Sequence, residues 1–155
     1  MKTLILGIGN PILSDDSVGC RVAQQLGERL KGHKHITVKE TSLSGLSLLD
    51  EVAGYERLII VDAIQTRDGK AGAVYKLSPD DFKAGRMAII HDVGLFGAME
   101  LGRKLEMAMP REVVIFAIEA KDVTTFSEEC SPEVEGAIPE VVEVVMREVS
   151  ADADK

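Results

Sequence analysis

Short apolar runs rich in β-branched residues alternate with helical patterns along the whole chain, and this alternation constrains the fold most. Buried strands are predicted at 2–8, 57–63 and 112–120, and shorter strands at 35–41 and 72–78. Apolar runs of this length are typical of strands covered on both faces. The pattern therefore predicts an α/β three-layer sandwich around a mostly parallel, twisted sheet of about five strands, with room for one antiparallel member.

Helical patterns fill the intervals between these strands. Apolar periodicity and cap residues predict helices at 16–30, 44–54 and 94–107, and a last helix that begins at Ser131-Pro132. Pro139 is expected to kink or restart that last helix, because proline lacks the N–H that a helix interior needs. One face of the last helix is apolar and comprises Val134, Ile138, Val141, Val142, Val145 and Val149.

Size and charge limit the domain organisation and the partners. A chain of 155 residues fits a single domain over 1–155, with residues 150–155 expected to form a frayed polar tail. The formal net charge of -8 disfavours nucleic acid and anionic membranes as partners. No apolar run approaches the roughly 20 residues of a membrane span, and the first residues make a poor signal peptide. Cys20 and Cys130 match no metal spacing, and a disulfide is not expected. A cytoplasmic protein is therefore predicted.

Acidic residues and a histidine follow several of the predicted strands. They are Asp15 and Asp16, Asp62, His91 with Asp92, and Glu119. Ligand sites of open α/β sheets gather beyond the carboxyl ends of the strands, so these side chains are expected at one edge. Carboxylates without balancing lysine or arginine raise each other's pKa, and a bound cation removes that cost. The residues therefore predict a metal site.

Each of these residues also has a simpler interpretation. Asp15 or Asp16 is well placed to cap the following helix, although a cap explains one of the two more easily than both. Asp62 is compatible with local side chain-to-backbone bonding at a strand end. His91 is compatible with a helix entry, and Glu119 with the first polar position after a strand.

Gly7, Gly9 and Asn10 form a glycine turn after the first strand, but it is a weak nucleotide signal. The dinucleotide fingerprint requires a third glycine where this chain has Ile12, and the Gly-Lys-Ser/Thr of a P-loop is absent. The acidic pair that follows would repel a pyrophosphate. The glycines are instead predicted to give the backbone room and a turn conformation that brings the next loop close to the strand ends.

Four segments together resemble a known family. They are GIGNPILSDDSVGCRVAQQL, LIIVDAIQ, HDVGL and TFSEECSPEVEGAIPEVVEVV. They closely resemble the NiFe-hydrogenase maturation proteases, and the resemblance extends from Leu4 to about Glu148. The combination of the glycine turn, the acidic pair, the strand-end aspartate and the His-Asp pair is much more specific than any single part.

The resemblance implies a set of site residues. Asp16, Asp62 and His91 correspond to the family's three nickel ligands and are the implied catalytic residues. The implied supporting residues, which shape the turn or orient a ligand, are Asp15, Gly7, Gly9, Asn10 and Asp92. Some members have glutamate where this chain has Asp16, and glycine where it has Ser17.

The resemblance also implies the activity. It is a nickel-dependent, aspartyl-type endopeptidase that removes the C-terminal extension of a hydrogenase large-subunit precursor after nickel insertion. Nickel is expected to arrive with this substrate, with zinc, cadmium or cobalt able to replace it in vitro. Two carboxylates and an imidazole suit such ions, and three protein ligands leave coordination positions open for substrate groups or water. Whether the metal polarises the carbonyl, activates water or positions the peptide is left open.

Two other functions use the same features. A non-catalytic chaperone or checkpoint protein would bind nickel or the maturing subunit through the same residues without cutting it. A nucleotide-binding module built on the glycine turn is the poorer alternative, because the acidic pair opposes it.

Overall fold

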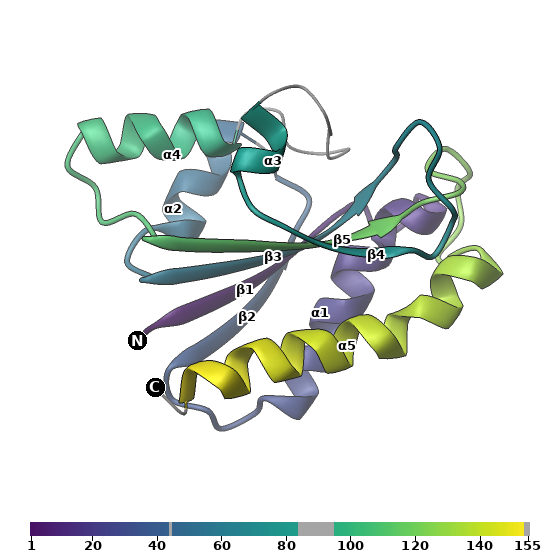
Figure 1. Cartoon of the computed structure of the whole chain (residues 1–155), viewed down its shortest axis with the longest axis horizontal. Helices are drawn as coiled ribbons and strands as arrows, with labels where there is room; N and C mark the ends of the chain where they lie inside the picture. The colour runs from purple at the N-terminus through teal and green to yellow at the C-terminus, as the bar shows by residue number, and fades with distance from the viewer. Residues whose placement is uncertain (44, 84–94, 154–155) are drawn as a thin grey trace.

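Five strands form one sheet in the computed structural model, which describes residues 1–43, 45–83 and 95–153 (Figure 1). The strands are β1 (Thr3–Ile8), β2 (Ile36–Thr41), β3 (Arg57–Ile64), β4 (Val74–Leu77) and β5 (Glu112–Glu119). Their order is β2-β1-β3-β5-β4, and β4 alone pairs in the antiparallel sense. The predicted fold class is confirmed, including the antiparallel member, which lies at one edge.

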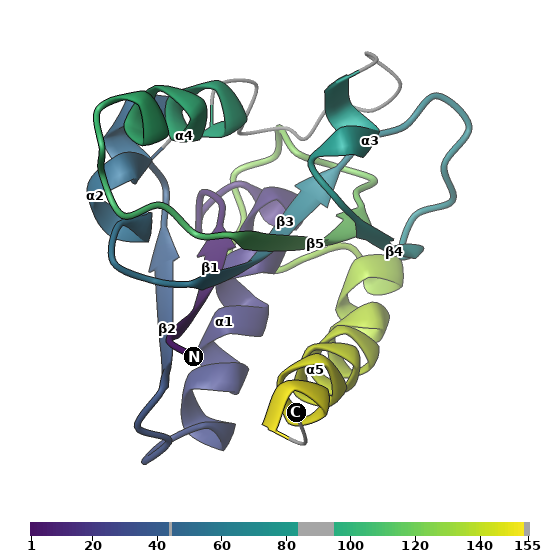
Figure 2. The same ribbon diagram turned by 60° about the vertical axis from the view of Figure 1, so that its left-hand side comes forward.

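Helices cover both faces of the sheet, as Figures 1 and 2 show. They are the 3-10 helices η1 (Ser14–Ser17) and η2 (Gly45–Leu48) and the α-helices α1 (Val18–Arg29), α2 (Leu49–Val52), α3 (Asp80–Lys83), α4 (Leu95–Lys104) and α5 (Pro132–Ala153). Helices α1 and α5 lie on one face, and α2 and α4 on the other. The three-layer arrangement follows from this division, since every central strand buries side chains on both faces.

Helix α5 differs from its prediction in one respect. It begins at Pro132 as expected, but Pro139 lies inside one helix that continues to Ala153, so the predicted restart is wrong. The proline is accommodated at the cost of one intrahelical hydrogen bond, because the apolar face of α5 is buried from Val134 to Val149. Residues 150–153 belong to this helix, and residues 154–155 lie outside the described residues.

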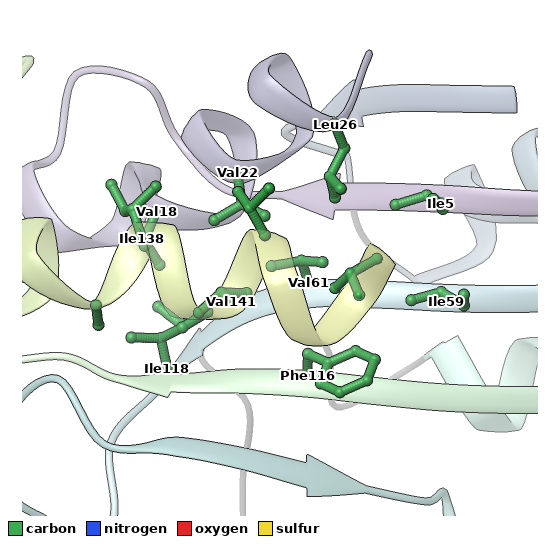
Figure 3. Packing of buried hydrophobic residues seen from close by; sticks show 14 of the residues in the cluster. Ile5, Val18, Val22, Leu26, Ile59, Val61, Phe116, Ile118, Ile138 and Val141 are labelled. Atoms are coloured by element: carbon green, nitrogen blue, oxygen red, sulfur yellow. The ribbon is translucent and has the colours of Figure 1, made fainter. Parts of the chain in front are cut away.

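The larger core lies between the sheet and the pair α1 and α5. Figure 3 shows Val22 of α1 and Val141 of α5 packed over Val61 and Ile118 of the sheet. The predicted apolar face of α5 is buried there, and so are Val18, Val22 and Leu26 of α1. Each fully buried side chain of this size contributes about 1.5–3 kcal/mol, so this layer supplies much of the stability that holds α1 against the strands.

Helix α1 approaches the sheet closely enough that glycine is required at the contact. A Cβ on Gly19 would lie 2.5 Å from the carbonyl oxygen of Ile8 and nearer still to that of Val61. A Cβ on Gly7 of β1 would lie 2.7 Å from that of Ala23. The two glycines therefore let the start of α1 rest on the ends of β1 and β3.

Within the part of the chain that the structure describes, no helix has the length and apolar character needed to cross a membrane. Cys20 is buried, Cys130 is partly buried, and both are free thiols in this structure.

Candidate functional site

The carboxyl ends of β1, β3 and β5 meet at one edge of the sheet, because these strands are parallel. The turn η1 follows β1 at this edge, and all four of its residues are buried. Register pairs Asp62 with Ala117, and Ile64 with Glu119. The topology therefore brings η1, Asp62 and Glu119 to the same edge, as the strand order predicts.

Asp62 lies near the end of β3 and is fully buried. It shares a sheet face with Ile60 and Ile64, which is the face that α2 and α4 cover. Its Oδ1 atom accepts a hydrogen bond of 2.8 Å from the amide of Ala63. The carboxylate is thus held at the boundary between the apolar core and the carboxyl edge.

Asp16 lies in η1 and is 2% exposed. Its Oδ2 atom accepts a hydrogen bond of 3.1 Å from the amide of Asn10. The Asn10 side chain in turn accepts one of 3.1 Å from the amide of Ile12, which closes the turn after β1. The N-cap residue of α1 is Ser17, and it makes no side-chain capping bond. Asp16 therefore does not act as the cap of α1, and its carboxylate is held against the turn that follows β1.

The thiol of Cys20 lies within electrostatic reach of both aspartates. Burial, together with the negative charges of Glu40, Asp62 and Asp16, raises the pKa of Cys20 to about 12. The Sγ atom also lies 3.5 Å from the carbonyl oxygen of Gly9. Both aspartates thus act on one buried group beside the end of β1. Glu40, at the end of β2, is an acidic neighbour that sequence reasoning missed, because β2 reads as an ordinary edge strand.

Asp15 is fully buried and its carboxylate accepts four hydrogen bonds. The donors are the amides of Lys121, Asp122 and Ser131 and the hydroxyl of Ser131, at 2.8, 2.9, 2.6 and 2.9 Å. None of these donors belongs to α1, so Asp15 does not cap that helix. It connects η1 to the segment between β5 and α5.

Glu119 is 2% exposed and holds the segment after β3. Its carboxylate accepts hydrogen bonds from the amide and hydroxyl of Thr66, at 2.8 and 2.5 Å, and from the hydroxyl of Tyr75 at 3.0 Å. Burial and this bond raise the pKa of Tyr75. These bonds give Glu119 a bracing role at the edge of the site.

Gly7 and Gly9 differ in part from their prediction. Neither has a positive φ, and what both provide is room. A Cβ on Gly9 would overlap the carbonyl oxygen of Asp16. The backbone of η1 consequently lies directly against the end of β1, which brings Asp16 over the sheet.

His91 and Asp92 lie outside the described residues. In sequence, His91 comes four positions before Leu95, the first residue of α4. Of the three predicted metal ligands, the structure thus places Asp16 and Asp62. Across residues 1–43, 45–83 and 95–153, no three His, Cys, Asp or Glu side chains form a group suited to a metal ion. Two buried carboxylates could supply part of the ligand set of a divalent cation. An added imidazole ligand would favour an ion such as nickel, zinc or cobalt.

Known proteins share both the sequence pattern and this fold. The family model of hydrogenase maturation proteases matches residues 20–148. The hydrogenase 2 maturation protease of Escherichia coli K12 is 30% identical over 84 residues, which are 54% of this chain and 51% of that protein. The chain thus spans about half the length of this curated relative.

Two solved structures are similar over almost the whole chain. The hydrogenase maturating endopeptidase HybD of E. coli superposes with a TM-score of 0.79 at 25% identity, covering 98% of this chain and 94% of that one. The NiFe hydrogenase maturation protease HybD of Thermococcus kodakarensis gives 0.69 at 26% identity, covering 95% and 98%. Because the family model spans most of the sequence and the fold agrees, this chain belongs to the hydrogenase maturation protease family.

Proposed function

We propose that the chain is an endopeptidase that removes the C-terminal extension of a NiFe-hydrogenase large-subunit precursor after nickel insertion. The observation that carries this proposal is the pair of buried aspartates, Asp16 and Asp62, at the carboxyl edge of the sheet in a member of this family. Relatives in the family bear the names maturation protease and maturating endopeptidase, which supports a peptidase.

Nickel is part of the substrate in this proposal, carried by the precursor. Asp16 and Asp62, together with His91, are the groups of this chain that would contact it. When bound, nickel supplies a Lewis acid for the scissile carbonyl and a fixed point that holds the peptide in register. Oxygen and imidazole ligands suit nickel, and zinc, cadmium or cobalt would be accepted by the same donors.

The chain's own contribution is to hold the carboxylates in place before substrate arrives. The amides of Asn10 and Ala63 each fix one oxygen, of Asp16 and Asp62 respectively. Both aspartates are buried, so their charges act on a bound cation with little screening by water. A preorganised anionic pair of this kind favours a cation-bearing substrate over one without the metal.

The test is processing of a purified precursor. The protein is mixed with nickel-loaded or nickel-free precursor, and the mass of the precursor is followed. We expect loss of a C-terminal fragment with the nickel-loaded precursor alone. Asp16→Asn, Asp62→Asn and His91→Ala should each slow this step by more than about 100-fold, since even residues that only orient a metal ligand are worth 10–100-fold.

Asp122→Asn is the matched control. It makes the same chemical change at the same edge, but the Asp122 carboxylate bonds to Thr124 and Thr125 within its own segment. It should process precursor at the wild-type rate. Unchanged processing by Asp16→Asn and Asp62→Asn would refute the site. A stable complex at unchanged precursor mass would replace the endopeptidase with a non-catalytic checkpoint protein.

We also propose the cytoplasm as the place of this reaction. The two cysteines are free thiols, which suits a reducing compartment. Fractionation of cells that produce the tagged protein tests this location, and recovery outside the cytoplasm would overturn it.

A further inference from the structure

The segment between β5 and α5 lies along the turn that carries Asp16. The amide of Ser14 donates to the carbonyl of Ser127, and the amide of Ser127 donates to the carbonyl of Ile12, both at 2.9 Å. The amide of Asp15 donates to the carbonyl of Asp122, also at 2.9 Å. Leu13 and Ser127 thereby form a short parallel bridge. Two segments far apart in sequence are joined at the carboxyl edge.

The Asp15 carboxylate closes this junction from the side of the turn. Three of its hydrogen bonds reach one oxygen, Oδ2, and one reaches Oδ1. The donors stand at both ends of the segment 121–131, so one side chain ties the beginning and the end of that segment to η1. Hydrogen bonds to a charged acceptor are stronger than neutral ones, and the site is fully buried.

The next residue in the chain is Asp16. The Asp16 carboxylate is carried by η1, and the bonds of Asp15 help to fix the position of η1. A shift of η1 would therefore move Asp16 relative to Asp62 on β3. Asp62 belongs to a central strand and cannot follow such a shift. The bonds of the Asp15 carboxylate are therefore among those that fix the relative placement of the two aspartates.

We propose that Asp15 is a positioning residue, which sets the Asp16 carboxylate for the metal-bearing substrate by tying η1 to segment 121–131. The role in substrate binding rests on the proposed function. The effect of Asp15 on the position of Asp16 can be measured without any cleavage. The amide of Asn10 donates to Asp16 Oδ2, so hydrogen exchange at that amide reports the position of the Asp16 carboxylate.

Asp15→Asn is the informative variant. Asparagine keeps the size of the side chain but has one acceptor oxygen, so at least one of the four donors would face an NH2 group. Asp122→Asn is the matched control in the same segment. Asp122 joins the junction through its backbone amide and carbonyl, which the substitution keeps. Its carboxylate accepts from the amides of Thr124 and Thr125, at 3.0 Å each, through one oxygen that asparagine retains. Asp16→Ala marks the exchange rate expected when the acceptor is absent.

The first measurement is amide hydrogen exchange by NMR on the full chain, under conditions where every variant is folded. Asp15→Asn should accelerate exchange of the Asn10 amide at least about tenfold, toward the rate of Asp16→Ala. Asp122→Asn should leave that rate unchanged. Wild-type protection of Asn10 in folded Asp15→Asn would overturn the proposal and leave Asp15 with a stabilising role alone.

The second measurement uses nickel-loaded precursor. Asp15→Asn should lower kcat by about 10–100-fold while KM changes little, as expected for a residue that orients a metal ligand. An equal kcat in folded Asp15→Asn and wild type would also overturn the proposal. If the wild type itself does not cleave the precursor, the proposed function fails, and the exchange measurement still decides the role of Asp15.

Discussion

Replacing Gly19 by alanine should destabilise the protein, although alanine is the better helix former. The added Cβ would lie 2.5 Å from the carbonyl oxygen of Ile8 and closer to that of Val61, where about 3.4 Å is an ordinary contact. Both oxygens belong to strands in the middle of the sheet and cannot rotate away. Helix α1 must therefore move off the sheet by about 1 Å, which loosens its packing along its buried face.

The magnitude follows from two opposing terms. Overpacking of this kind costs about 3 kcal/mol, the upper part of the usual range, because the obstructing atoms are backbone. Alanine returns about 1 kcal/mol of helix propensity. The net loss is about 2 kcal/mol, a large share of the 5–15 kcal/mol that stabilises a typical domain. For a domain of this size it corresponds to a fall in Tm of about 4–8 °C.

Gly27→Ala is the control in the same helix. Nothing lies within 4 Å of a Cβ at that position, so the substitution should be neutral or stabilise by up to about 1 kcal/mol. Urea denaturation followed by circular dichroism measures both variants. Equal stability of Gly19→Ala and Gly27→Ala would refute the close packing of α1 on β1 and β3.

Two further predictions use paired comparisons. Glu148→Gln should cost about 2–3 kcal/mol in urea denaturation, because Glu148 is 18% exposed and bonds at 2.6 Å to Arg57, itself 4% exposed. Glu143→Gln on the same helix should cost less than about 1 kcal/mol, since its ion pair is exposed; an equal cost would contradict the difference in burial. Iodoacetamide at pH 8.5 should label Cys130 before Cys20, because Cys20 is buried and its pKa is raised to about 12, which leaves little thiolate. Peptide mass spectrometry follows both sites, and equally fast labelling would contradict the burial of Cys20.

The strands and helices were predictable from the sequence because their signals are local. Apolar runs marked all five strands to within two residues at each end, and the spacing of apolar residues marked the buried faces of α1 and α5. The expected effect of Pro139 was too strong, because tertiary packing along α5 outweighs one lost hydrogen bond. Local propensity cannot weigh such a long-range contribution.

The position of Asp16 and Asp62 at one edge was predictable from the sequence, but the hydrogen bonds around them were not. Strand order alone places Asp62 and the turn with Asp16 at one edge, as expected for parallel strands. The role of Asp15 was beyond sequence reasoning, because its donors are mostly backbone amides, which carry no residue-type signal, 106 to 116 positions away. The bracing role of Glu119 was also beyond sequence reasoning, because no sequence pattern links it to its partners Thr66 and Tyr75.

The distance along the chain between Asp15 and its donors has a consequence for the timing of assembly. A nascent chain that ends before residue 121 contains every predicted metal ligand, yet it lacks all four groups that bond the Asp15 carboxylate. Closing this junction also joins segments more than 100 residues apart, which makes it a late step in folding. A chain of that length therefore holds the predicted ligands without the bonds that fix η1 to segment 121–131. On the proposed function, Asp16 and Asp62 reach their final arrangement only after Ser131 has been synthesised.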